Sequence, residues 1–397
     1  MNLDFTPEYE AFRSEVRDFL ETHKESAPRM SDRGVRSEKR KAWQKILLEH
    51  GYAARTLPKE YGGYGAAPDA LKSRIIAEEF SRAKMPGGIS GQGINMLVPT
   101  LLELGTEEQK QKYIEPTLTG DMVWCQGYSE PGAGSDLAAL RTAAVLEGDH
   151  FVVNGQKIWT STAAQADMIF CLVRTEPDAP KHQGISYLLF SMDTPGIEVR
   201  PLMTMTGQAE FNEVFFTDVR VPADQIVGKR GEGWMVANAT LTHERGMLGD
   251  PDAALSRLNS IAEIMQTETI DGAPLMDNAV YRDRLIALQG EVYAMKFNGM
   301  RLTTYANEKK SAGMAGMIVK LQGCELNHRL AELAIDVMGE YGILFEDSPF
   351  IRDHGMWQTA YMFDLGLIIG GGSAQIQKNI ISERGLDMPR EPKVAKK

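Results

Sequence analysis

A glycine-rich run in the middle of the chain has the composition of a ligand-binding loop. Gly127 to Asp136 reads GYSEPGAGSD, with three glycines and two serines. Its N–H groups and hydroxyls are the donors that a phosphate or a flavin pyrimidine ring needs, and glycine lets a ligand approach the backbone closely. A structural turn has the same composition. The run is neither a Walker A loop nor a GxGxxG fingerprint, so it does not indicate an ordinary Rossmann site.

Two further runs could bind a ligand. In Gln156 to Thr162 (QKIWTST), Trp159 stands between hydroxyl residues at the end of an expected strand, where it either packs in the core or covers an aromatic ring. In Gly370 to Gln377 (GGGSAQIQ), glycines end a helix and leave N–H groups for an anion or a carbonyl oxygen, unless the run is only a tight helix–helix junction. The run GKRGEGW, Gly228 to Trp234, lacks the Ser or Thr that follows a P-loop lysine and reads as a linker.

The first part of the chain has a helical pattern. From Phe5 to about Gly120, apolar residues recur at three- and four-residue spacing. Thr6 followed by Pro7 is a helix start, and Thr106 with Gln109 is a capping box.

From Met122 the pattern changes to short strands. A hairpin is predicted from two segments, Thr142 to Leu146 and Phe151 to Asn154, with the turn residues Gly148 and Asp149 between them. Further strands are predicted at Ile169 to Val173, Tyr187 to Phe190 and Val214 to Phe216. Because the helical period returns after Trp234, we predict an α+β fold with domains at residues 1–121, 122–234 and 235–397.

Composition argues against several classes of function. The 397 residues carry a net charge of −11, which disfavours nucleic acid or an anionic membrane as the main partner. No stretch approaches the roughly 18 apolar residues of a membrane span, and the acidic start MNLDFTPEYE is unlike a signal peptide, so we expect a cytoplasmic protein. We expect Cys125, Cys171 and Cys324 to be free thiols, and no histidine spacing indicates a metal site.

Nearly the whole chain, from Phe5 to Arg390, resembles the acyl-CoA dehydrogenase flavoproteins. The resemblance is carried by GYSEPGAGSD, NGQKIWTS, FFTDVRVP and GGSAQIQKNIISERGL, in that order along the chain. It implies an N-terminal helical domain, a small sandwich-like or barrel-like β domain and a C-terminal four-helix bundle. It also implies FAD held between domains and against a neighbouring subunit.

The resemblance assigns roles to single residues. The residues implied to contact FAD are Gln126, Tyr128 and Ser129 at the isoalloxazine ring, Gly134 and Ser135 at the diphosphate, Trp159 and Ser161 near the reactive nitrogen, and Ser373 and Gln375. The residues implied to contact the acyl-CoA are Ser135, Thr242, Arg245 and Gly371.

The catalytic base is the main departure from the common family pattern. Removing a proton alpha to a thioester needs a carboxylate in an apolar site. Many relatives place a Glu where this chain has Gly371, but Glu244 in LTHERGM matches the base position of isovaleryl-CoA and long-chain acyl-CoA dehydrogenases. The alternative is that Glu244 and Arg245 form a solvated ion pair. Thr242 stands where relatives often have Asp, which puts the usual pantetheine contact in doubt.

Two segments depart where FAD is implied to meet a neighbouring subunit. Thr269 to Leu285 lacks the family's Arg-x-x-Phe element, for which Arg282 or Arg284 is a substitute. Asp336 and Glu340 replace the usual Gln and Gly. The combination resembles bacterial dehydrogenases for large acyl groups, some of which are heteromers.

The sequence therefore predicts an FAD-dependent acyl-CoA dehydrogenase that forms a trans-2-enoyl-CoA, with Glu244 as base and an electron-transferring flavoprotein as electron acceptor. We expect a homotetramer or dimer, or a heteromer. The alternatives are the base-bearing subunit of a heteromer for bulky acyl groups such as steroid side chains, an acyl-CoA oxidase, and a non-catalytic supporting subunit; Gly371 disfavours a nitroalkane oxidase. GMLGDP, Gly246 to Pro251, is expected to interrupt or bend the helix after the base and to widen the acyl pocket. The alternative is a short surface irregularity whose space is refilled by Met side chains.

Overall fold

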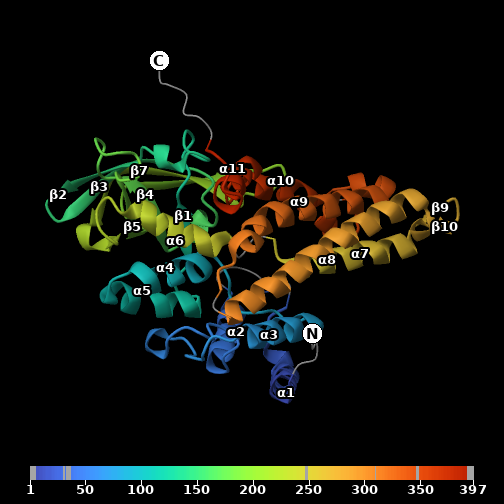
Figure 1. Cartoon of the computed structure of the whole chain (residues 1–397). Helices are drawn as coiled ribbons and strands as arrows, with labels where there is room; N and C mark the ends of the chain where they lie inside the picture. The colour runs from blue at the N-terminus through green and yellow to red at the C-terminus, as the bar shows by residue number, and fades with distance from the viewer. Residues whose placement is uncertain are drawn as a thin grey trace. The chain divides into compact units, whose positions relative to one another are not determined.

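Contacts in the computed structural model divide the chain into two compact units (Figure 1). The first unit comprises Met1–Thr204 and Ala209–His243, and the second comprises Met205–Gln208 and Glu244–Lys397. The structure describes residues 6–29, 32, 37–245, 249–308, 310–345 and 348–390.

The helices of the first unit follow the predicted period. They are α1 (Pro7–Thr22), α2 (Glu38–Glu49), α3 (Ala70–Arg82), α4 (Val98–Leu104), α5 (Glu107–Thr119) and α6 (Gly233–Arg245), whose last two residues belong to the second unit. Pro7 is the first residue of α1, and the apolar residues that recur along this helix form a buried stripe of Phe12, Val16, Phe19 and Leu20. The capping box of α5 forms as predicted, because Thr106 and Gln109 each accept the other's backbone N–H.

One sheet of eight strands follows the first five helices. The strands are β1 (Trp124–Gly127), β2 (Ala143–Glu147), β3 (His150–Lys157), β4 (Met168–Arg174), β5 (Ile185–Ser191), β6 (Ile197–Leu202), β7 (Phe211–Pro222) and β8 (Ile226–Val227). Their order is β6-β7-β3-β2-β4-β5-β8, and β1 pairs in parallel with β4. The predicted hairpin is β2–β3, with Gly148 at a φ of 63° in its turn. Strands β1, β6 and β8 were not predicted.

Strand β4 is buried on both faces. Side chains alternate along a strand, so Phe170 joins a core shared with α4 and α5, whereas Ile169 and Cys171 join a core shared with β3 and β7. The ring of Phe190 on β5 lies 5.7 Å from that of Phe216 on β7, although these strands are not neighbours in the sheet. The sheet therefore curls over its inner face, which agrees with the predicted sandwich-like or barrel-like β domain.

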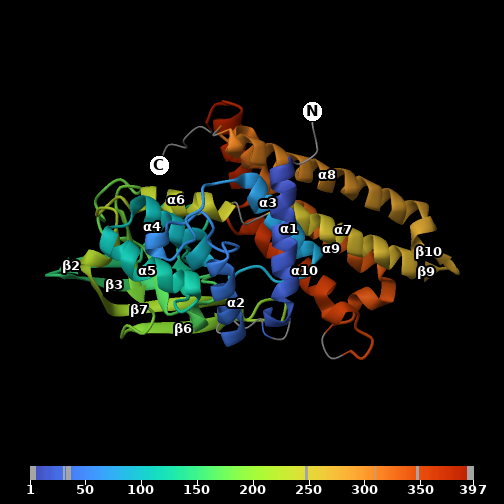
Figure 2. The same ribbon diagram turned by 90° about the horizontal axis from the view of Figure 1, so that it is seen from below.

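The second unit is a helical bundle, as predicted. Its helices are α7 (Pro251–Thr267), α8 (Ala279–Asn307), α9 (Gly313–Val337), α10 (Met356–Ile369) and α11 (Ala374–Ile380). Helices α7, α8 and α9 pack on one another, α10 packs on α9, and the short strands β9 (Thr269–Ile270) and β10 (Ala273–Pro274) join α7 to α8 (Figure 2). The predicted helix interruption is seen at Gly249, which has a φ of 84°, and α7 begins at Pro251 behind the capping side chain of Asp250. Residues 246–248 lie outside the described part.

The described residues provide neither a reactive thiolate at Cys171 nor a helix suited to cross a membrane. All three cysteines are free, as predicted, and the structure shows that they are also buried. Burial raises the pKa of the Cys171 thiol to about 12, so this cysteine is not a thiolate nucleophile at neutral pH. No helix in the described ranges is both long and apolar enough to cross a bilayer.

A buried carboxylate on α3 forms ion pairs with arginines of α1, and we expect these pairs to stabilise the fold. Glu79 on α3 is 1% exposed and accepts hydrogen bonds from Arg13, Arg17 and Arg82. Hydrogen bonding from Arg17, opposed by burial and assisted by the other two arginines, lowers the pKa of Glu79 to about 2. Because the folded-state pKa is depressed, this stabilisation is complete above the ordinary carboxyl pKa and is lost as pH falls from about 4.5 towards 2.

We expect Glu79→Gln to lower the free energy of unfolding at pH 7 by about 2–3 kcal/mol, because three cations lose their shared anion. Urea denaturation at pH 7 and at pH 4 measures the effect, which should be smaller at pH 4. Glu78→Gln is the matched control, since Glu78 is half-buried and also pairs with Arg13. Equal losses in the two variants would contradict a special role for the buried carboxylate.

Candidate functional site

A buried ion pair fixes the first glycine run to the sheet. Lys157, at the end of β3, is fully buried, and its Nζ donates to Glu130 Oε1 at 2.8 Å and to the carbonyl oxygen of Tyr128 at 3.1 Å. Glu130 also accepts the backbone N–H groups of Arg141 and Thr142, at 2.7 and 2.8 Å. Burial raises the pKa of the Glu130 carboxyl, but Lys157 and these hydrogen bonds outweigh burial and hold the pKa below its ordinary value.

The tip of the same run is open to a ligand. Gly134 and Ser135, the predicted diphosphate contacts, are both exposed. A Cβ added at Gly132 or Gly134 would meet no atom within 4 Å. The loop is therefore held at its base by Glu130 and uncovered at its tip.

The three residues predicted to contact the flavin ring, Gln126, Tyr128 and Ser129, differ in exposure and in the groups available to a ligand. The side chain of Tyr128 is 5% exposed and packs between two aromatic rings of the core. A cofactor contact from Tyr128 would therefore have to use its backbone. Gln126 is half-buried on β1, and the carbonyl oxygen of Ser129 accepts the N–H of Ile158 at 2.9 Å. That bond places the predicted ring contacts beside the start of the tryptophan run.

Trp159 follows β3 and is presented to solvent. Its side chain is 59% exposed, and its backbone has a φ of 60°, in the left-handed region that bulky residues rarely adopt. Thr160 is fully buried and exchanges two backbone hydrogen bonds of 3.0 Å with Asn212. The structure thus excludes the core alternative for Trp159, and a strained backbone at an exposed aromatic residue is typical of a ligand site.

Buried polar atoms without a partner occur next to Trp159 and the half-buried Ser161. Thr160 Oγ1, Asn212 Oδ1 and Glu210 Oε2 are buried and make no hydrogen bond within the described part of the chain. Burial raises the pKa of the Glu210 carboxyl. Buried polar groups are normally hydrogen-bonded, so these three atoms are local exceptions beside the exposed Trp159.

The last glycine run begins where α10 ends. Gly371 and Gly372 have φ values of 64° and 93°, which glycine adopts without strain. The carbonyl oxygen of Gly371 accepts from Gln377 Nε2 at 3.1 Å. The hydroxyl of Ser373 caps α11, where it accepts a backbone N–H at 3.4 Å, and Gln375 is exposed. Ser373 and Gln375 therefore lie in one helix start.

The predicted base lies in the last turn of α6. Glu244 and Arg245 end this helix, but their side chains lie outside the described part. Thr242 is exposed and donates to the carbonyl oxygen of Asn238 at 2.9 Å. Of two other carboxylates, Asp364 is fully buried and bonded to Arg257 at 2.6 Å, which ties it into the bundle. Glu340 is exposed.

Two residues in the segments that depart from the family pattern form an ion pair with each other. Arg284 on α8 donates to Asp336 on α9 at 2.6 Å. This pair occupies Arg284, one of the two arginines considered as substitutes for the missing Arg-x-x-Phe element.

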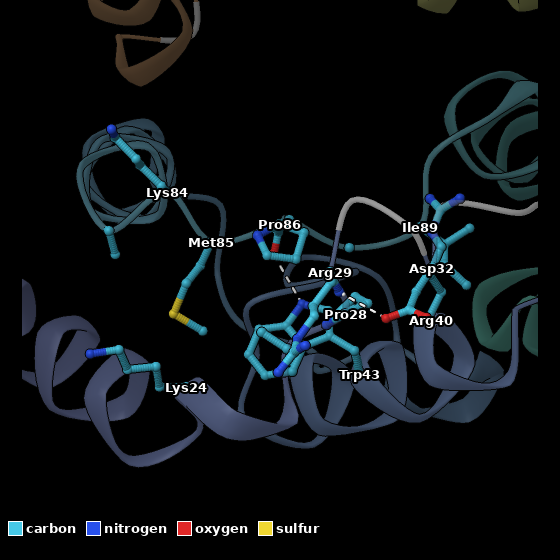
Figure 3. A pocket seen from close by; sticks show the side chains of 14 residues that line it. Lys24, Pro28, Arg29, Asp32, Arg40, Trp43, Lys84, Met85, Pro86 and Ile89 are labelled. Carbon is cyan, nitrogen blue, oxygen red and sulfur yellow. Dashed lines mark hydrogen bonds between the residues drawn. The ribbon is translucent and has the colours of Figure 1, made fainter. Parts of the chain in front are cut away.

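A cavity of about 740 Å³ lies away from all of these residues. It is formed by the loop after α1, by α2 and by the loop after α3, with Trp43 donating to the carbonyl oxygen of Pro86 at 2.9 Å (Figure 3). None of the predicted site residues lines it.

Comparisons with known proteins cover almost the whole chain. Models of the acyl-CoA dehydrogenase N-terminal, middle and C-terminal domains match residues 6–121, 125–219 and 231–386. The chain is 40% identical over 358 residues to "Acyl-CoA dehydrogenase IpdE1" of Mycobacterium tuberculosis, and the match covers 90% of each protein.

Solved structures agree with these matches. "Tcur3481-Tcur3483 steroid ACAD" superposes with a TM-score of 0.82 at 30% identity, over 98% of this chain and 100% of that one. The "ChsE4-ChsE5 complex from Mycobacterium tuberculosis" superposes with a TM-score of 0.79 at 31% identity, over the same shares.

Proposed function

Because this chain belongs to the acyl-CoA dehydrogenase family of oxidoreductases, we propose that it converts an acyl-CoA thioester to a trans-2-enoyl-CoA with FAD as its cofactor. The observation that carries the proposal is Trp159, exposed in a left-handed backbone beside an open glycine loop that a buried ion pair holds. We propose the domain borders predicted from the sequence, and the three matched family segments support them.

The residues of the first unit fit a flavin nucleotide. Gly134 and Ser135 offer an uncovered loop for a diphosphate, and Trp159 offers an aromatic face for a ring. The proposed FAD contacts are Gln126, Tyr128, Ser129, Gly134, Ser135, Trp159, Ser161, Ser373 and Gln375.

We assign the proton transfer to Glu244. Its carboxylate would accept the proton alpha to the thioester, with Arg245 orienting that carboxylate or the CoA arm. Thr242, Ser135 and Gly371 complete the proposed substrate contacts. FAD, when bound, supplies the acceptor for the hydride that leaves the beta carbon, and an electron-transferring flavoprotein is the proposed onward acceptor.

A more specific alternative is that this chain is the base-bearing subunit of a heteromeric dehydrogenase for a bulky acyl group. It is supported by two similar solved structures whose names each join two proteins, one of these structures being named as a steroid ACAD. The non-helical residue Gly249 before α7 and the absence of a side chain at Gly371 support it independently, because we expect both to leave room beside the proposed reacting carbon.

We expect kcat/KM for a branched or ring-bearing acyl-CoA to exceed that for a straight medium-chain acyl-CoA by at least tenfold. Each additional CH₂ that fills an apolar pocket contributes about 0.8 kcal/mol, so a few extra carbon atoms account for this ratio. Steady-state assays with paired thioesters measure it. A preference for the straight chain would contradict the wide pocket and leave the assignment of Glu244 intact.

Anaerobic mixing of the purified protein with a panel of acyl-CoA thioesters tests the function itself. We expect a yellow protein whose flavin absorbance bleaches with at least one thioester. A colourless protein that takes up no added FAD would identify a supporting subunit instead. Steady peroxide production in air would identify an oxidase.

A further inference from the structure

A buried lysine holds the last glycine run from inside the bundle. Lys320, on α9, is 2% exposed. Its Nζ donates to the carbonyl oxygen of Ile368 at 3.0 Å and to that of Gly372 at 2.6 Å. One ammonium group therefore joins the last turn of α10 to the loop that follows it.

The location suits a cation for a physical reason. The last carbonyl groups of a helix have no partner within the helix and carry the negative end of its dipole. Ile368 is the penultimate residue of α10, so Lys320 satisfies one of these carbonyl groups. The ammonium group has three donors, and a second one bonds the carbonyl oxygen of Gly372.

The loop depends on such external contacts for its shape. Gly370, Gly371 and Gly372 have no side chains, and glycine loses more conformational freedom on ordering than any other residue. Gln377 holds the carbonyl of Gly371, and Lys320 holds that of Gly372. A trans peptide group is planar with its N–H opposite its C=O, so holding a carbonyl also fixes the direction of the N–H across the same peptide bond.

We propose that Lys320 is a positioning residue of the glycine loop, residues 370–373, and that together with Gln377 it orients the N–H groups of Gly372 and Ser373 towards the thioester carbonyl oxygen of the acyl-CoA. The inference rests on the proposed function. Negative charge grows on that oxygen when the alpha proton leaves, and preorganised N–H donors stabilise it. Lys320 acts only through the loop and does not contact the substrate.

A pair of CoA ligands separates this role from general support of the fold. One ligand is an acyl-CoA thioester, and the other is the matching S-alkyl-CoA thioether, which lacks the carbonyl oxygen. We expect the wild type to bind the thioester more tightly than the thioether. In Lys320→Met, the ratio of the thioether dissociation constant to the thioester dissociation constant should fall about tenfold. Titration of the flavin spectrum at equilibrium measures both dissociation constants without turnover.

Three further variants keep the test decisive. Lys320→Arg retains a cation and should retain most of the discrimination, whereas Lys320→Gln has a neutral amide on a shorter side chain and should lose it. These two decide the question if the Met variant does not fold. Lys378→Met removes an exposed lysine from α11 and should change nothing.

The proposal would be overturned if Lys320→Met bound both ligands more weakly by the same factor, or if it left both dissociation constants unchanged. In the first case Lys320 only supports the fold, and in the second the loop is positioned without it. Failure of the proposed function has a different signature, because the wild type itself would then bind neither ligand and bleach with no thioester.

Discussion

Glu244→Gln is expected to retain FAD and to lose at least 100-fold in the rate at which acyl-CoA reduces the flavin. A positioned general base contributes about 10² to 10⁴ to a proton transfer, and glutamine keeps the shape of the side chain without its basicity. Stopped-flow reduction under anaerobic conditions measures the rate, and the flavin spectrum before mixing reports cofactor content. Dissociation of the acyl-CoA should change little, because the substituted group is uncharged and similar in size.

Two control variants test whether another carboxylate is the base. Glu340→Gln alters an exposed carboxylate and should leave reduction unchanged. Asp364→Asn should lower stability more than reduction, because Asp364 is buried and bonded to Arg257. Normal reduction by Glu244→Gln would refute the assignment.

A second substitution on the Glu244→Gln background extends the test. Gly371→Glu places a carboxylate where many relatives carry theirs, so it should restore part of the lost rate. The φ of 64° at position 371 is unfavourable for glutamate, and the rescue is therefore expected to be incomplete.

Local patterns predicted much of the fold because they depend on neighbouring residues. The stripe of α1 and the capping box of α5 are set within one or two helical turns, and the β2–β3 hairpin is set by Gly148 and Asp149. Strand β1 is four residues long, and β6 is half-exposed and contains Pro201. Such segments are strands only because a neighbouring strand pairs with them, which a single-sequence pattern does not reveal.

The sequence pointed to exposed residues of the candidate site but not to the buried residues that hold them. Motif resemblance pointed to Trp159 and Gly134, which the structure places at exposed positions suited to a ligand. Glu130 and Lys157 lie inside the same motifs, but composition gives no sign that these charges are buried. Lys320 lies in a helix whose pattern gives no sign that its ammonium group reaches the loop 52 residues later. Burial of a charge is a property of the whole fold, because its partners come from distant segments.

Lys157→Met is expected to lower the free energy of unfolding at pH 7.5 by about 3–5 kcal/mol, because it leaves Glu130 as a buried anion without its cation. FAD affinity should fall at least tenfold, since the carbonyl oxygen of Tyr128 and the base of the glycine loop lose the group that holds them. Urea denaturation and equilibrium titration with FAD measure the two effects. Lys181→Met is the matched control, because Lys181 pairs with Asp136 at the end of the same run and is exposed. Its loss should be about 0–1 kcal/mol.

The pH dependence of the Lys157→Met deficit identifies its cause. In the wild type the pKa of Glu130 is depressed, so the pair stabilises the fold above the ordinary carboxyl pKa and less as pH falls through the folded-state value. Without Lys157, burial is the dominant influence and raises the pKa of Glu130, so the carboxyl group becomes protonated at a higher pH and its burial costs less. The difference in unfolding free energy between the variant and the wild type should therefore shrink from pH 7.5 to pH 5. A difference that is constant over this range would show that Lys157 contributes packing rather than charge, and the loop would then be held by the hydrogen bonds that Glu130 accepts from Arg141 and Thr142.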